Sequence, residues 1–264
     1  MLKIENVKKV FNAGTANEKV ALSGLNLELK EGDFVTVIGG NGAGKSTMLN
    51  SVAGVYEVDE GKILIDGVDV THLPEYKRAK FIGRVFQDPM MGTAATMQIE
   101  ENLALAARRG KPRTLRVGIT KQEREAYREK LKILELGLED RLTAKVGLLS
   151  GGQRQALTLL MATLQQPKLL LLDEHTAALD PKTAAKVLDV TQKIVEQNKL
   201  TTLMITHNMR DAITYGNRLV MMYDGHVVVD VSGEEKKNLT VEQLLSLFSK
   251  ASGSNEANDK LLLS

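Results

Sequence analysis

Apolar residues follow a strand-like pattern in the first third of this 264-residue chain. Up to about residue 87 the sequence predicts short strands separated by glycine turns. The β-branched run 34–38 is the clearest of these strands, and it stops at Gly39. The segment 62–70 predicts a hairpin that turns at Asp66-Gly67, a dipeptide that favours tight hairpin turns.

Helical periodicity replaces this pattern between residues 88 and 166. It predicts one helix over 97–107 and another over 121–136, with apolar residues recurring on one face of each. A third helix is expected over 153–164, where it would follow a serine and two glycines. This segment is therefore expected to be a helical insertion between two parts of a core.

A pattern of alternating strands and helices resumes near residue 167. The apolar runs 169–173 and 203–206 flank a helical segment over 182–197, which is the βαβ arrangement of a parallel sheet covered on both faces. The segment 220–231 predicts a second hairpin, turned at Asp224-Gly225.

These patterns predict an α/β fold with a mixed sheet, an N-terminal antiparallel β part and an inserted helical part. Thr240 and Gln243 form a capping box that would open a last helix. We expect one domain over 1–250, followed by a tail that is rich in Ser, Asn and Gly. The expected divisions are a core of 1–87 and 167–235, a helical insertion of 88–166, a C-terminal helix of 236–250 and a flexible tail of 251–264.

Composition narrows the class of protein. The 43% of hydrophobic residues fall in short runs, none of which reaches the ~18 residues that a membrane-spanning helix needs. Residues 1–6 lack the apolar core of a signal peptide, and the absence of cysteine excludes disulfides, thiolate catalysis and Cys-ligated zinc. The net charge of +2 and the scarcity of aromatic residues in the basic stretch 108–132 predict no nucleic-acid partner. We therefore expect a soluble, cytosolic protein.

A phosphate loop follows the strand over 34–38. Residues 39–47 satisfy the pattern G-x-x-x-x-G-K-[ST], and a helix expected over 45–53 and closed by Gly54 supplies the context that this motif requires. The glycines let backbone N–H groups converge on phosphate oxygens, while Lys45 adds a positive charge and Ser46 offers a hydroxyl to Mg²⁺. The sequence thus predicts a site for ATP and Mg²⁺ at Gly39, Gly40, Asn41, Gly42, Ala43, Gly44, Lys45, Ser46 and Thr47.

Asp173 and Glu174 follow four consecutive leucines. They would stand at the carboxyl end of a buried strand, where open α/β sheets bind ligands. Taken alone, an acidic pair after a strand is usually a solvated loop, but a phosphate loop in the same chain changes this interpretation. Asp173 is then suited to the Mg²⁺ shell, and Glu174 to polarising the water that attacks the γ-phosphate.

The segment Leu149-Ser150-Gly151-Gly152-Gln153 reads, by spacing alone, as a helix N-cap and a glycine turn. Together with the phosphate loop and the acidic run, it resembles the signature motif of the ATP-binding cassette (ABC) ATPases, and the resemblance covers nearly all of residues 2–248. In that family the motif binds the γ-phosphate of an ATP held by a second subunit. The resemblance therefore implies a phosphate-loop NTPase core, a homodimer, and a nucleotide contact by Ser150, Gly151, Gly152 and Gln153.

Smaller matches to the family extend this resemblance. Gln87 matches a glutamine that senses Mg²⁺ and the attacking water, and His207 matches a histidine that contacts the γ-phosphate. Phe11 is the best candidate for stacking on adenine, and a packed strand residue is the less favoured alternative. The segment 178–180 matches a loop that crosses the dimer interface. The resemblance thus implies catalytic roles for Glu174, His207, Gln87 and Lys45, and metal ligands at Ser46, Gln87 and Asp173.

His175 departs from the family, which usually has proline after the catalytic glutamate. A histidine there could titrate near the site, or it could be a tolerated substitution in a loop. The stretch 169–182 also resembles a branch of importer ATPases associated with the uptake of aromatic or other amino acids.

We therefore predict the ATP-hydrolysing subunit of an ABC importer for an amino acid or another small solute. The resemblance implies a homodimer at the cytoplasmic face of the membrane, separate permease subunits docked at the helical insertion, and a solute-binding protein. An ABC exporter ATPase is one alternative. A transporter-independent ABC ATPase is another, although such proteins typically have two cassettes or long coiled coils. A small-molecule kinase would leave residues 149–153 unexplained.

Overall fold

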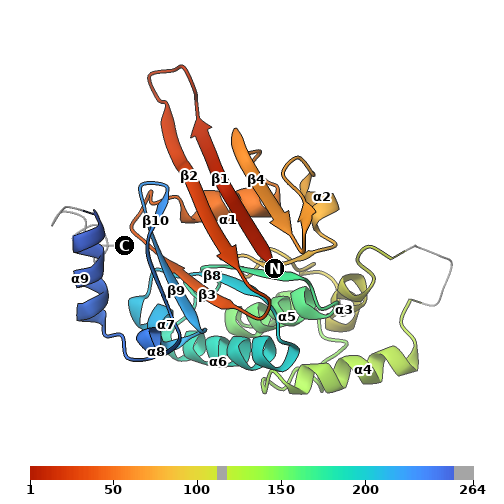
Figure 1. Cartoon of the computed structure of the whole chain (residues 1–264). Coiled ribbons are helices and arrows are strands. Elements are labelled where there is room, and N and C mark those ends of the chain that lie inside the picture. Colours follow the sequence, from red (N-terminus) through yellow and green to blue (C-terminus); the bar gives the residue numbers. More distant parts are fainter. Residues whose placement is uncertain (112–117, 253–264) are drawn as a thin grey trace.

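Two β-sheets pack against the helix α1 (Lys45–Ala53) in the computed structural model, which describes residues 1–111 and 118–252 (Figure 1). One sheet is mixed and has the strand order β10-β9-β3-β8-β7-β6. Its β9 and β10 pair antiparallel, and its other neighbours pair parallel. The strands of this sheet are β3 (Phe34–Ile38), β6 (Ile82–Val85), β7 (Leu169–Asp173), β8 (Thr202–Ile205), β9 (Arg218–Tyr223) and β10 (His226–Ser232).

The second sheet is antiparallel, with the order β2-β1-β4-β5. Its strands are β1 (Leu2–Phe11), β2 (Lys19–Leu29), β4 (Glu60–Ile65) and β5 (Val68–Asp69). The prediction of short strands is wrong for β1 and β2, which have 10 and 11 residues. The reason is a bulge at Asn6, whose φ is 47°, because it shifts the register of β1 against β2 and interrupts the alternation of apolar residues. The hairpin predicted over 62–70 is present, with Asp66 and Gly67 both at positive φ.

Both faces of the six-stranded sheet are buried, which explains the uninterrupted apolar runs in its strands. Leu169 and Leu171 of β7 belong to the core that the sheet shares with α1 and the antiparallel sheet. Leu170 and Leu172 belong to the core on the opposite face, beneath α5 (Gly151–Thr163) and α6 (Pro181–Asn198). Successive side chains of a strand point to opposite faces, so the four leucines fill two cores and hold Asp173 at the carboxyl edge.

The chain between β6 and β7 is helical, as predicted. It contains α3 (Ile99–Ala107), α4 (Lys121–Lys132), a 3₁₀ turn (Val146–Leu148) and α5. The prediction of a helix over 121–136 is wrong at its end, because Glu135 and Gly137 take left-handed φ values of 54° and 68° and turn the chain after Lys132. In Figure 1, α3 and α4 lie at the opposite end of the molecule from α9 (Val241–Ser252).

The remaining helices are α2 (Glu75–Arg78), α7 (Met209–Thr214) and α8 (Gly233–Lys237). The predicted capping box opens α9, where the side chains of Thr240 and Gln243 each accept a hydrogen bond from the other residue's backbone N–H. Residues 253–264 of the predicted tail lie outside the described residues. No helix in the described ranges is long and apolar enough to cross a membrane.

Candidate functional site

The phosphate loop joins the end of β3 to the start of α1, as the sequence predicts. Gly39, Gly42 and Gly44 have φ values of 153°, 83° and 99°, which favour glycine. A Cβ atom on Gly39 would lie 2.3 Å from the carbonyl oxygen of Met222, and one on Gly44 would lie 2.6 Å from that of Ala21. No side chain caps α1, so the N–H groups of its first turn can bind an anion.

Lys45 directs its ammonium group back into the loop. Its Nζ donates to the carbonyl oxygens of Gly39 at 2.6 Å and Gly40 at 3.3 Å. Burial lowers the pKa of Lys45, while the negative charges of Glu174 and Asp173 act in the opposite direction. The loop therefore holds a buried positive charge next to an uncapped helix end.

Asp173 ends β7 and lies opposite Ile205 of β8. Burial raises the pKa of its carboxyl group, and the neighbouring Arg84 works against that shift. Arg84 reaches across from β6, with Nη2 3.4 Å from Asp173 Oδ2 and 2.7 Å from Asn50 Oδ1. Sequence reasoning missed Arg84, because it meets Asp173 through the pairing of two strands that are far apart in the chain.

Glu174 and His207 lie side by side beyond the ends of β7 and β8. Glu174 Oε2 is 3.6 Å from His207 Nδ1. The backbone of Glu174 has a left-handed φ of 44°, and its N–H donates to the carbonyl oxygen of Ile205 at 3.1 Å. This pair is placed to contact one water molecule or one phosphate group together.

Gln87 and Asp173 line the same open cavity, which has a volume of about 710 Å³. Ser46 is exposed on the first turn of α1. The carboxylate, hydroxyl and amide oxygens of these three side chains are hard ligands that fit Mg²⁺, which also takes phosphate and water oxygens. The described residues contain no group of three or more His, Cys, Asp or Glu that could hold a metal by themselves.

Ser150 caps the N-terminus of α5, as predicted. Its Oγ accepts from the N–H of Gln153 at 3.2 Å, and the Gln153 side chain accepts from the N–H of Ser150 at 3.2 Å. A Cβ atom on Gly152 would lie 2.1 Å from Cγ2 of Thr183, because the start of α6 packs against this turn. Within the described residues, 150–153 make no hydrogen bond to the phosphate loop.

Phe11 lies at the end of β1, with its ring edge-on to Tyr56 at a centroid distance of 5.2 Å. Its cross-strand partner is Lys19 of β2. The Nζ of Lys19 lies 3.6 Å from the position of a Cβ atom on Gly42, so this strand pair places a cation beside the phosphate loop. Sequence reasoning missed Lys19, since no local pattern distinguishes it from other charged turn residues.

His175 is buried, with 1% of its surface exposed. Its Nε2 lies 3.1 Å from Oγ1 of Thr191 on α6. Burial lowers the pKa of His175 to about 4, so the imidazole is neutral at neutral pH. The burial of the ring and its lowered pKa argue against the interpretation that His175 titrates beside the site, and favour that of a substitution the loop tolerates.

Comparison with known proteins places these features in context. Residues 22–177 match a family model described as "ABC transporter". A tyrosine transport ATP-binding protein of Clostridioides difficile is 45% identical over 248 residues, which cover 94% of this chain and 98% of that protein. The phosphonates import ATP-binding protein PhnC of Bacillus thuringiensis is 34% identical over 241 residues, with 89% and 90% covered.

Solved structures agree with these sequence matches. A dimeric post-hydrolysis state of the ATP-binding cassette MJ0796, bound to ADP and Pi, has a TM-score of 0.74 and 33% identity to this chain. The match covers 88% of this chain and 98% of that one. The ADP conformation of the cassette MJ1267 has a TM-score of 0.75 and 27% identity, with 94% and 98% covered.

Proposed function

This chain belongs to the ABC transporter family, and on that premise we propose that each ATP is bound between two copies of the chain. The binding and hydrolysis of ATP would then drive the import of an aromatic amino acid. The observation that carries this proposal is the separation of two anion-binding helix ends in one chain. The start of α1 lies at the phosphate loop, beside Asp173 and Glu174. The start of α5 is fully formed but makes no hydrogen bond to that loop within the described residues.

In this proposal the nucleotide is bound mainly by the phosphate loop. Lys45 and the first N–H groups of α1 bind the outer phosphates, and Phe11 stacks on the adenine. Ser46, Asp173 and Gln87 hold Mg²⁺, which offsets the phosphate charge when bound. Glu174 accepts a proton from the attacking water, and His207 contacts the γ-phosphate.

The start of α5 supplies the second half of the site in the partner copy. The Ser150 oxygen already accepts a hydrogen bond from Gln153, so its hydroxyl proton remains available for a phosphate oxygen. The positive end of the helix dipole adds to that contact. Support for the shared site comes from the similar cassette MJ0796, which is a dimer in its post-hydrolysis state.

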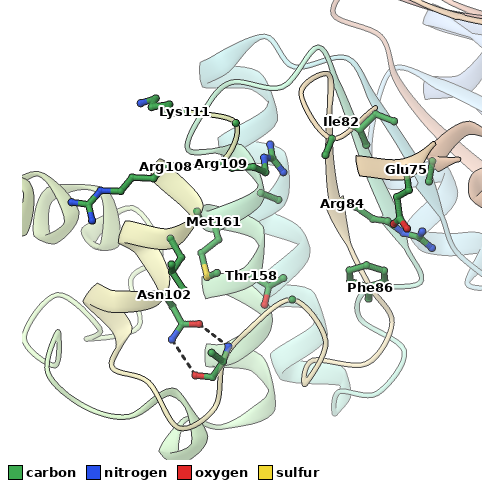
Figure 2. Close-up of a pocket in the computed structure, with 18 residues that line it drawn as sticks. Glu75, Ile82, Arg84, Phe86, Asn102, Arg108, Arg109, Lys111, Thr158 and Met161 are labelled. Atoms are coloured by element: carbon green, nitrogen blue, oxygen red, sulfur yellow. Dashed lines mark hydrogen bonds between the residues drawn. The ribbon is translucent and has the colours of Figure 1, made fainter. Parts of the chain in front are cut away.

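A cavity of about 930 Å³ is our candidate docking site for a permease subunit (Figure 2). Ile82 and Met161 contribute apolar surface, and Leu105 at its edge is 58% exposed. Arg84 and Phe86 line both this cavity and the smaller one that contains Gln87 and Asp173. A segment of the permease in this cavity would therefore lie next to the hydrolytic site.

Docking of this kind would hold the chain at the cytoplasmic face of the membrane. We propose that the helical segment 88–166 moves against the core formed by 1–87 and 167–235 when ATP binds. The hinge would be Gln87, because this residue lies two positions after the end of β6 and lines the nucleotide-side cavity. Conformational change, rather than the chemistry of hydrolysis, would then be the output.

The proposed cargo rests on the 45% identity to a tyrosine transport protein over almost its whole length. A solute-binding protein would deliver the amino acid to the permease. The test is uptake of labelled tyrosine and of labelled phosphate in a strain that lacks this gene, complemented with the wild type or with Glu174→Gln. Only the wild type should restore tyrosine uptake, and phosphate uptake should not change. Normal tyrosine uptake in the deletion strain would contradict the proposed cargo.

A further inference from the structure

We propose that His175 is a positioning residue for ATP hydrolysis, and that its hydrogen bond to Thr191 on α6 anchors the turn that aims Glu174. The inference rests on the proposed function of Glu174 as the base for the attacking water. It gives a role to a buried histidine that the proposed mechanism does not otherwise use.

The direction of the hydrogen bond follows from the contacts of Thr191. Its Oγ1 lies 2.8 Å from the carbonyl oxygen of Val187, one turn earlier in α6, and donates its only proton there. The same oxygen must therefore accept from the imidazole, whose Nε2 is 3.1 Å away. His175 is thus the neutral tautomer with hydrogen on Nε2, buried and bonded to a helix on the second face of the sheet.

Glu174 needs such an anchor because its backbone conformation is unfavourable. A left-handed φ of 44° crowds the Cβ of any residue other than glycine. One side of the turn is held by β8, through the hydrogen bond from the Glu174 N–H to Ile205. The chain leaves the turn through His175, and the bond to Thr191 holds this second side.

A proline after Glu174 would restrict the same turn by another means, because its ring would fix the φ of residue 175 itself. In this chain the backbone N–H of His175 makes no hydrogen bond within the described residues. Proline at this position would therefore cost no hydrogen bond. The histidine and the proline are two solutions to one problem, and the histidine solution depends on Thr191.

The first experiment removes the acceptor with Thr191→Val, which keeps a branched side chain of similar size. The kcat for ATP hydrolysis should fall roughly tenfold, the change expected for losing one buried hydrogen bond, while the KM for ATP stays within about twofold. Thr191→Ser should restore kcat. The matched control is Thr163→Val, because this buried helical threonine bonds only to carbonyl oxygens of its own helix and should leave kcat unchanged.

The second experiment introduces Thr191→Val into two other variants, His175→Pro and Glu174→Gln. His175→Pro should keep most of the activity, and adding Thr191→Val to it should cause no further loss. Thr191→Val should also have no effect on the residual rate of Glu174→Gln. The inference would be overturned if Thr191→Val lowered kcat equally in the wild type and in His175→Pro. It would also be overturned if Thr191→Val raised KM by the same factor as it lowered kcat.

A folding defect, a failure of the positioning role of His175 and a failure of the proposed role of Glu174 each give a different result. If Thr191→Val alone does not fold, a folded and active His175→Pro/Thr191→Val protein supports the inference, and an unfolded one overturns it. If Glu174→Gln hydrolyses ATP at the wild-type rate, the proposed role of Glu174 is wrong. A silent Thr191→Val with a slow Glu174→Gln defeats the positioning role alone.

Discussion

The N-termini of α1 and α5 both contain glycines, but their backbone amides are satisfied in different ways. Gly44 caps α1 without any side-chain hydrogen bond, whereas Ser150 and Gln153 cap α5 through a reciprocal pair. The amides of α1 are thus left for a ligand, and those of α5 are partly satisfied by the protein itself. A phosphate would complete the first helix end and would only add to the second.

The glycines at these two helix ends also differ in purpose. Gly42 and Gly44 have positive φ, which favours glycine, and Gly44 also leaves room for the carbonyl oxygen of Ala21. Gly152 is required by packing alone, since a Cβ atom there would meet Thr183 of α6. The N-terminus of α1 has uncapped backbone amides, while that of α5 is packed against α6 and presents the exposed Ser150. The comparison teaches that a glycine-rich motif has to be interpreted from its neighbours.

The largest expected effect tests whether both helix ends act on one ATP. Glu174→Gln keeps the shape of the side chain but removes the base, so hydrolysis should slow by on the order of 10² to 10⁴. The protein should then accumulate as a dimer with Mg·ATP and return to monomer with ADP. Phosphate release and light scattering after size exclusion measure the two effects, with Glu135→Gln as a surface control. Fast hydrolysis by the variant would contradict the role of Glu174.

The next effect concerns the N-terminus of α1, which we propose binds the phosphates directly. Lys45→Ala removes the buried ammonium group, and ATP affinity should fall on the order of 10²-fold, because a hydrogen bond to a charged group contributes about 1.5–3 kcal/mol. Isothermal titration calorimetry measures the affinity, and Lys145→Ala is the control. Unchanged ATP affinity in a folded Lys45→Ala protein would defeat the phosphate-loop assignment.

The N-terminus of α5 can be altered by substitution without changing any residue at the N-terminus of α1. Ser150→Arg in the Glu174→Gln background should weaken the ATP dimer at least about tenfold, because a bulky cation replaces the hydroxyl, while each monomer still binds ATP. Ser150→Ala should cost about 1 kcal/mol of folding stability through the lost cap. Light scattering and thermal unfolding report the two outcomes. A stable Ser150→Arg dimer would show that this helix end does not contribute to the shared site.

The smallest expected effect concerns Lys19, which lies beside the phosphate loop at the N-terminus of α1. Lys19→Met removes an exposed charge beside Gly42, and ATP affinity should fall roughly three- to fivefold, in keeping with an exposed ionic contact. Adenosine binding should stay unchanged, because Lys19 would contact phosphate and not the base. Lys62→Met is the matched control, since Lys62 is an exposed lysine on β4 of the same antiparallel sheet. Equal losses for ATP and adenosine would place Lys19 outside the phosphate site.

The sequence determined the parts of this protein that depend on local chemistry. Residues 34–54 contain the strand, the glycines and the helix of the phosphate loop in order, because each is specified by its own neighbours. The run 169–173 predicted a strand buried on both faces, and Ser150 with Gln153 predicted a capped helix. These features need only the period of the side chains and the hydrogen bonds of adjacent residues.

The tertiary structure alone decided which distant residues meet. Arg84 contacts Asp173 because β6 pairs with β7, and Lys19 reaches the phosphate loop because β2 lies beside it. The burial of His175 depends on α6, which places Thr191 over a turn that sequence pattern treats as an exposed loop. Contacts of this kind arise from sheet pairing and helix packing over long sequence separations, and no local pattern encodes them.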